Sequence, residues 1–319
     1  TAVPPVDGRD ADEVLTLAAA AESDSEHPLA RAIVGAAETG GLPLVFGMTV
    51  VGGFVQVAFA PLLFALAEGF PRQALLTHPL ELPDWRSSRH EVFYYLYLVT
   101  ALEQMLSGRS TICESDPDAS IQISEARRVE TTDLLRVHGV TDDDALVAIC
   151  PGSINSRAKR WPAQFYANLA DRLIESRRKV LLVGSKDEVD VSEDVTRRMR
   201  HQPVVLTGKT NLDQVTAVLS RADLIVTNDT GPAHIGAALG RPTIVIFGPT
   251  NPLTTRPFSP VAEILRHPPE CAPCMLRDCP IDHRCMTAIT VDEVFERSHV
   301  LLKRGSFAKT VRSLCDSVA

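Results

Sequence analysis

The chain has 319 residues, of which 45% are hydrophobic and 23% charged, and its formal net charge is −8. This length and composition predict a globular protein of about two domains, and the negative charge argues against a nucleic-acid-binding protein. The seven cysteines do not indicate a secreted disulfide scaffold. The first residues, TAVPPVDGRDADE, are acidic where a targeting segment would be basic, so we expect a cytoplasmic protein.

The beginning of the chain is its least regular part. Residues 1–41 form one helix-rich segment, EVLTLAAAAESDSEHPLARAIVGAAE, with no partner strand nearby. No charged residue occurs over 39–67, and a run of this length raises the question of a transmembrane helix. Several glycines, Gln56 and Pro61 interrupt the run, and basic residues do not flank it. We therefore favour a buried strand and helix, or a poorly folding segment, over a membrane span.

Regular alternation of strands and helices begins near residue 145, after two amphipathic helices expected at 86–106 and 124–138. Apolar runs predict strands at 145–150, 179–184, 203–206, 223–228 and 242–248. Helices are predicted at 161–176, 189–200, 211–222 and 232–240. Continuous apolar strands joined by helices predict an α/β domain, a Rossmann-like parallel sheet covered on both faces. Ligands of such sheets bind at the carboxyl ends of the strands.

The most informative stretch is IVTNDTGPAH, residues 225–234. An apolar strand stops at Asn228, and a small-residue helix follows the turn Asp229-Thr230-Gly231. Unpaired N–H groups at the start of a helix, with the helix dipole behind them, form an anion site. Asp229 supplies an acceptor for sugar hydroxyls, and Thr230 is a candidate N-cap and phosphate donor. The alternative is a capped turn without a ligand.

Two further polar loops are expected at the same sheet edge. The loop after strand 145–150, PGSINSRAKRWP, carries polar and basic side chains: Ser153, Ser156, Arg157, Lys159 and Arg160. Lys159 is suited to a diphosphate as a point charge, and Arg157 or Arg160 as a bidentate donor. Glu188 or Asp190, after the next strand, would hold ribose hydroxyls or favour a helix dipole. Although such cations are often merely solvated, several polar loops on one edge favour a ligand.

The segments PGSINSRAKRWPAQFYANLADRL, VLLVGSKDEVDVS, VVLTGKTNL, IVTNDTGPAHIGAALG, IFGPTNPLTTRPFS and CAPCMLRDCPIDHRCM occur in this order. Together they resemble the lipopolysaccharide heptosyltransferases of glycosyltransferase family 9, and more narrowly the heptosyltransferase II group. The resemblance covers roughly residues 70–303. It implies a GT-B fold, with two Rossmann-like domains and a cleft between them. It also implies an ADP-heptose donor and a lipid A–Kdo acceptor at the cytoplasmic face of the inner membrane.

The resemblance also implies a mechanism and a set of donor-binding residues. Lys159 would hold the diphosphate, Glu188 the ribose, and Asp229 with its two following residues the heptose and phosphates, while His234 lies one helical turn further in. The reaction would be an inverting displacement that leaves ADP and requires no bound metal. The expected donor site is the following set: Ser153, Lys159, Glu188, Asp229, Thr230, Gly231 and His234.

The N-terminal part departs from the family pattern. Family members begin with a strand and a Gly-Asp turn whose aspartate is the expected general base, and no such motif precedes residue 70. Residues 6–44 instead resemble the nucleotide-binding domain of heavy-metal P-type ATPases, with Ser25-Glu26-His27-Pro28 as the histidine–proline motif and Glu22 before it. The other motifs of such pumps are missing. We therefore expect a P-type-ATPase-like fragment at 1–46, a partial acceptor-side domain at 47–140 and the nucleotide-sugar domain at 141–319.

The cysteines and the overall function leave alternatives open. Cys271, Cys274, Cys279 and Cys285, with His283 nearby, have the density of a zinc or iron–sulfur site. Their unequal spacing also fits a reduced loop or two disulfides, so no metal is assigned. We expect a heptosyltransferase, impaired if its base is lost. The alternatives are a non-catalytic ADP-sugar-binding module, a GT-B enzyme for another nucleotide sugar, and a metal-pump fragment.

Overall fold

The computed structural model describes residues 57–59, 62–66, 78–110 and 117–316. The chain divides into two compact units, the first ending at Pro117 and the second beginning at Asp118. The segment 1–46, with Glu22 and His27, lies outside the described residues, and so does most of the charge-free run. The resemblance of that segment to P-type ATPases therefore stays a prediction.

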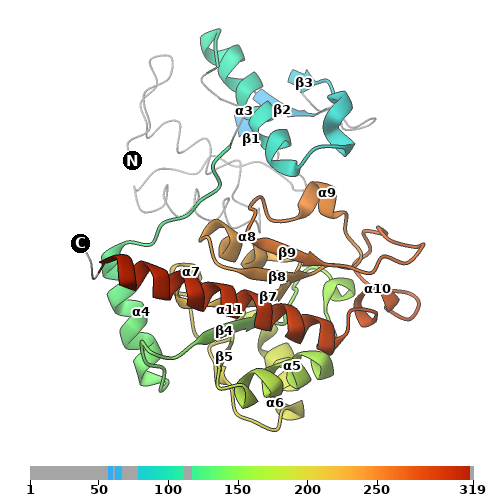
Figure 1. Ribbon diagram of the computed structural model, residues 1–319. Helices are drawn as coiled ribbons and strands as arrows, with labels where there is room; N and C mark the ends of the chain where they lie inside the picture. The colour runs from blue at the N-terminus through green and yellow to red at the C-terminus, as the bar shows by residue number, and fades with distance from the viewer. Residues whose placement is uncertain (1–56, 60–61, 67–77, 111–116, 317–319) are drawn as a thin grey trace. The chain divides into compact units, whose positions relative to one another are not determined.

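The first unit contains a small mixed sheet and one long helix (Figure 1). Its strands are β1 (Val57–Phe59), β2 (Leu62–Leu66) and β3 (His78–Leu80), in the order β1-β2-β3, with β1 antiparallel and β3 parallel to β2. The described part of the charge-free run thus forms two strands. Within the described ranges, none of the helices combines the length and the apolar character that crossing a bilayer requires.

Helix α3 (Glu91–Ser107) follows the short 3-10 helix η2 (Asp84–Ser87). The ring of His90 accepts a hydrogen bond from the N–H of Val92 and so caps the first turn. Gly108 ends the helix in the left-handed region, with φ 71°, where a side chain would be strained. The helix predicted at 86–106 is therefore confirmed, beginning five residues later than expected.

The second unit is built on a six-stranded, entirely parallel sheet in the order β6-β5-β4-β7-β8-β9. The strands are β4 (Leu146–Cys150), β5 (Lys179–Leu182), β6 (Val204–Val205), β7 (Leu224–Asn228), β8 (Thr243–Ile246) and β9 (Ala262–Leu265). Because β4 lies between β5 and β7, the direction of strand addition reverses there. Ligands of open α/β sheets bind at such a reversal.

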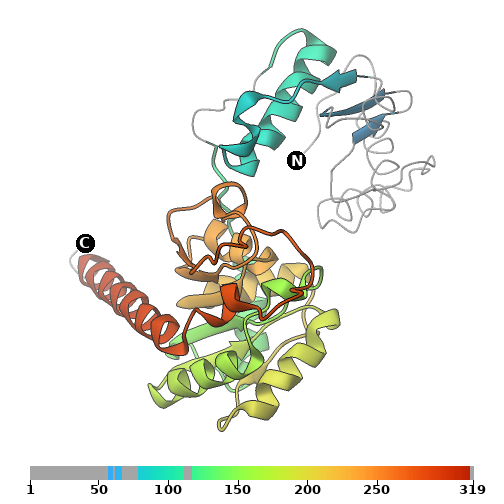
Figure 2. The same ribbon diagram turned by 90° about the vertical axis from the view of Figure 1, so that its right-hand side faces the viewer.

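Helices cover both faces of this sheet (Figure 1). The helix bounds are α4 (Glu125–Val137), η3 (Arg157–Lys159), α5 (Ala163–Glu175), η4 (Lys186–Glu188), α6 (Val189–Arg198), α7 (Leu212–Arg221), α8 (Gly231–Ala238), α9 (Pro252–Thr255), α10 (Arg284–Thr287) and α11 (Val291–Asp316). Alternate strand residues enter two separate cores: Val147 and Ile149 pack with α5, α6 and α11, whereas Leu146 and Ala148 pack with α4 and α7. Figure 2 shows α11 along one side of the unit.

The five strands and four helices predicted from residue 145 onward are confirmed. Each is slightly shorter than predicted, and α8 begins one residue earlier, at Gly231. Strand β9 and helix α11 were not predicted. β9 is a short edge strand that contains a charged residue, Glu263, so its sequence lacks a continuous apolar run. The guanidinium of Arg297 in α11 binds that carboxylate, with Nη2 2.7 Å from Oε2. The charge that interrupts the apolar pattern of β9 is therefore neutralised by an ion pair with α11.

Candidate functional site

The loops that follow β4, β7 and β8 meet at the carboxyl edge of the sheet, because these three strands are direct neighbours. The loop after β4 contains Ser153 and Lys159, the turn after β7 contains Asp229, and the loop after β8 contains Thr250. This confirms that the first two loops share one edge.

Asn228, the last residue of β7, ties the loop after β4 to the sheet. Its amide Nδ2 donates to the carbonyl oxygens of Pro151 and Gly152, at 2.8 and 3.1 Å. Its Oδ1 accepts from the N–H of Trp161 at 3.0 Å and from the hydroxyl of Tyr166 at 2.9 Å. The side chain is fully buried, and burial raises the pKa of the Tyr166 hydroxyl, which stays protonated as a donor. Four hydrogen bonds from one amide therefore fix both ends of the loop.

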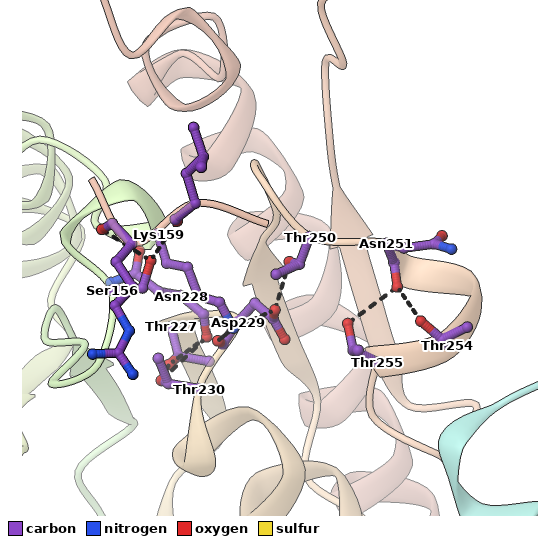
Figure 3. A network of polar contacts seen from close by, with 12 residues as sticks. Ser156, Lys159, Thr227, Asn228, Asp229, Thr230, Thr250, Asn251, Thr254 and Thr255 are labelled. Atoms are coloured by element: carbon purple, nitrogen blue, oxygen red, sulfur yellow. Dashed lines mark hydrogen bonds and ion pairs between the residues drawn. The ribbon is translucent and has the colours of Figure 1, made fainter. Parts of the chain in front are cut away.

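Lys159 and Asp229 form an ion pair at this edge (Figure 3). The ammonium Nζ lies 3.0 Å from Oδ2 of Asp229 and 3.1 Å from its backbone oxygen. The Asp229 side chain is 3% exposed and the Lys159 side chain 25% exposed. Thr250 donates a further hydrogen bond from its hydroxyl to the same Oδ2, at 2.6 Å. A buried carboxylate and a partly exposed ammonium group thus lie side by side. This arrangement suits a ligand that carries both hydroxyls and phosphates.

The turn after β7 has fewer free donors than the sequence analysis expected. Thr230 is the N-cap of α8 by position, but its side chain makes no capping hydrogen bond; its hydroxyl donates instead to the backbone oxygen of Asn228, at 3.4 Å. Pro232 has no N–H, and the N–H of Ala233 already bonds the Thr230 oxygen at 2.9 Å. His234 is exposed on the first turn of the helix. The donor N–H groups of an anion site are therefore confined to the very start of the turn.

The two arginines predicted as phosphate donors both have protein partners. Arg160 donates to the carbonyl oxygen of Ser153 through Nε at 3.1 Å and Nη2 at 2.9 Å. Arg157 donates through Nε to Asp278 at 2.7 Å. Both side chains thus help to hold the loop in shape, and their role as bidentate phosphate ligands stays a prediction. Ser153 is itself 3% exposed.

Glu188 is placed beside the loop after β4. Its Oε2 accepts from the N–H and the hydroxyl of Ser185, at 2.8 and 3.0 Å, which completes a capping box. A Cβ at Gly152 would lie 2.1 Å from Oε1 of Glu188, so only glycine leaves room for this carboxylate. Glu188 is therefore a helix cap whose other oxygen faces the start of the loop.

The cysteine-containing loop, residues 271–285, packs against two of the site loops. The carbonyl oxygen of Arg277 accepts from Ala158 N–H at 2.8 Å, and Pro249 accepts from the N–H groups of Cys274 and Met275, each at 3.0 Å. Figure 2 shows this segment, before α10, beside the loop after β4. The loop thus braces the backbone on both sides of the Lys159–Asp229 pair.

The four cysteines of this loop are free thiols, so the alternative of two disulfides is wrong for this structure: Cys271, Cys274, Cys279 and Cys285. Burial first, and the neighbouring thiols second, raise the pKa of Cys285 to about 11. Among the residues that the structure describes, no three histidine, cysteine or acidic side chains are gathered as metal ligands.

Thr250 is the site residue that the sequence analysis missed. It follows β8, which directly neighbours β7, so the strand order would have placed it beside Asp229. The continuous apolar run PTIVIFG predicts the strand but not its neighbour, because the sheet order does not follow the sequence order. Its position just after a predicted strand was the available signal.

Comparison with known proteins identifies the family. The model of glycosyltransferase family 9 (heptosyltransferase) matches residues 87–284. The chain belongs to glycosyltransferase family 9. The match includes the loops after β4, β7 and β8, so the ion pair and its surroundings lie within the family domain.

Curated relatives carry heptosyltransferase names. The chain is 40% identical over 125 residues to lipooligosaccharide heptosyltransferase 2 of Haemophilus influenzae, covering 38% of this chain and 36% of that protein. It is 32% identical over 150 residues to lipopolysaccharide heptosyltransferase 2 of Escherichia coli K12, covering 46% and 42%. The chain therefore spans half or less of the length of these relatives.

Two solved structures of the family show the same fold. An E. coli ADP-heptose lipopolysaccharide heptosyltransferase II is 26% identical with a TM-score of 0.61, covering 74% of this chain and 68% of that one. A family 9 glycosyltransferase from Veillonella parvula is 27% identical with a TM-score of 0.59, covering 74% and 66%. The GT-B-like α/β fold class predicted from the sequence is thereby confirmed.

Proposed function

We propose that the second unit binds ADP-heptose at the carboxyl ends of β4, β7 and β8, and that the protein transfers heptose to the lipopolysaccharide inner core. The observation that carries this proposal is the Lys159–Asp229 pair within the family domain. The exposed side of the ammonium offers a positive charge to a diphosphate, and the carboxylate offers an acceptor to sugar hydroxyls. A related protein from E. coli is named for ADP-heptose, which supports this donor.

Each proposed contact follows from a position in the site. Lys159 holds the diphosphate, the start of α8 at Thr230 and Gly231 adds backbone N–H groups, and Asp229 orients the heptose. Glu188 contacts the ribose through the oxygen that its capping box leaves over the loop. Two more positions complete the proposed set, Ser153 in the loop after β4 and His234 on the first turn of α8.

The proposed reaction is an inverting displacement. The acceptor hydroxyl attacks the anomeric carbon of the heptose while the bond to ADP breaks and the diphosphate takes the electron pair. Lys159 and the start of α8 stabilise the charge that develops on the leaving ADP, so the mechanism requires no metal. The general base would come from the acceptor side, and no Gly-Asp turn of the family type precedes residue 70 in the sequence.

For the rest of the chain we propose the domains expected from the sequence: a nucleotide-sugar domain at 141–319, an incomplete acceptor-side domain at 47–140 and a P-type-ATPase-like fragment at 1–46. Helix α4 and the residues from Asp118 onward pack with the second unit and extend the nucleotide-sugar domain toward the N-terminus. The acceptor is of the lipid A–Kdo type, met at the cytoplasmic face of the inner membrane.

A non-catalytic ADP-sugar-binding module is the second candidate, favoured by the missing base motif. Calorimetry with ADP and a transfer assay with ADP-heptose and a Kdo-bearing acceptor separate the two. Binding with transfer supports the enzyme, and binding without transfer supports the module. Binding of neither ADP nor ADP-heptose would overturn both, and preference for another nucleotide sugar would identify a different GT-B enzyme. ATP binding that depends on His27 and not on Lys159 would instead indicate a pump-like fragment.

A further inference from the structure

Thr250 contacts Asp229 in the polar network of Figure 3. It is 4% exposed and follows β8. Its hydroxyl donates to Oδ2 of Asp229 at 2.6 Å, a short distance typical of a donor bound to a charged oxygen. The same oxygen accepts from Nζ of Lys159 at 3.0 Å. One carboxylate oxygen is therefore shared between a hydroxyl and an ammonium group.

A diphosphate bound beside the ion pair would compete with Asp229 for the ammonium group of Lys159. The Asp229 carboxylate is almost completely buried, and a buried charge needs partners wherever the cation goes. An ammonium group has three N–H donors. Lys159 directs two of them to Asp229, one to Oδ2 and one to the backbone oxygen. The third donor is left for an anion, and any turn of Lys159 that brings a second donor to that anion breaks a contact with Asp229.

We propose that Thr250 is a positioning residue for anion binding by Lys159. Its hydroxyl keeps the Asp229 carboxylate hydrogen-bonded and in one orientation, so that Lys159 can bind the diphosphate of a sugar nucleotide without leaving a buried charge unpartnered. This inference rests on the proposed function, because it concerns the same donor site. It adds a residue from the third loop, which the sequence analysis did not assign.

The direct test is calorimetric titration of ADP into the full chain and into three variants. Thr250→Val removes the hydroxyl and keeps the shape of the side chain. We expect ADP to bind roughly 10-fold more weakly, because a Lys159 that turns to the diphosphate then leaves the Asp229 carboxylate without the Thr250 hydroxyl as a remaining partner. Thr250→Ser keeps the donor and should restore affinity to within about 3-fold. Thr254→Val is the matched control, because its hydroxyl bonds the backbone oxygen of Asn251 in the same loop and does not touch Asp229.

A double mutant separates positioning of Lys159 from general damage to the loop. In a Lys159→Ala background no ammonium leaves Asp229 on binding, so adding Thr250→Val should change ADP affinity by less than about 2-fold. If Thr250 merely supported the loop, or contacted ADP itself, Thr250→Val would weaken ADP binding as strongly with Lys159 absent as with it present.

Each outcome has one meaning. Coupling between Thr250→Val and Lys159→Ala, with rescue by serine, supports the inference. Unchanged ADP affinity in Thr250→Val, or equal losses in both backgrounds, overturns it while leaving the donor site in place. Failure of the unmodified chain to bind ADP overturns the proposed function itself, which the Thr250 comparison does not address.

Discussion

Replacing Asn228 by alanine should strongly destabilise the second unit. The amide makes four buried hydrogen bonds, to Pro151, Gly152, Trp161 and Tyr166. Each bond lost leaves a buried group without a hydrogen-bond partner and costs about 1 kcal/mol. The free energy of unfolding should therefore fall by about 4 kcal/mol. Tyr166→Phe removes one of the four and should cost about 1 kcal/mol.

The chain offers a clean assay for this comparison. It contains two tryptophans, Trp85 in the first unit and the buried Trp161 beside Asn228, so a Trp85→Phe background makes fluorescence report on the second unit. Urea unfolding of Asn228→Ala and Tyr166→Phe in that background measures both losses by the same signal. A cost for Asn228→Ala no larger than that for Tyr166→Phe would refute the four-bond account of the loop.

Two further predictions concern the flanks of the site. Gly152→Ala should lower the free energy of unfolding by about 1–2 kcal/mol, because its Cβ would displace the Glu188 carboxylate from Ser185. Urea unfolding measures this loss. A loss of the same size in a Glu188→Ala background would contradict the explanation. Cys285, with its pKa raised to about 11, is protonated at pH 8 and gains thiolate only as the pH approaches that value. Timed alkylation with iodoacetamide, read by peptide mass mapping, should therefore label exposed Cys271 well before Cys285 at pH 8, and equal rates would contradict it.

Strands β4 to β8 of the second unit were predictable because each lies in an apolar run, as in LVAIC of β4. Strand β9 was not, because Glu263 interrupts its apolar residues. The meeting of Lys159 and Asp229 was predictable too, since parallel strands bring their carboxyl ends to one edge. The contacts that Arg157 and Arg160 make within the protein were not predictable. Their partners are Asp278, 121 residues further along the chain, and a carbonyl oxygen within their own loop. Such contacts depend on how the loops fold over one another, which spacing does not reveal.

The central claim is that Lys159, held beside Asp229, binds the diphosphate of a sugar nucleotide. Titration of ADP into the full chain, into Lys159→Ala and into Arg157→Ala tests it most directly. Loss of the lysine removes a charge-assisted contact and should weaken binding roughly 10- to 100-fold. Loss of Arg157, an exposed cation already paired with Asp278, should change the affinity less than about 3-fold. Equal affinities for the unmodified chain and Lys159→Ala, or a larger loss in Arg157→Ala, would contradict the claim.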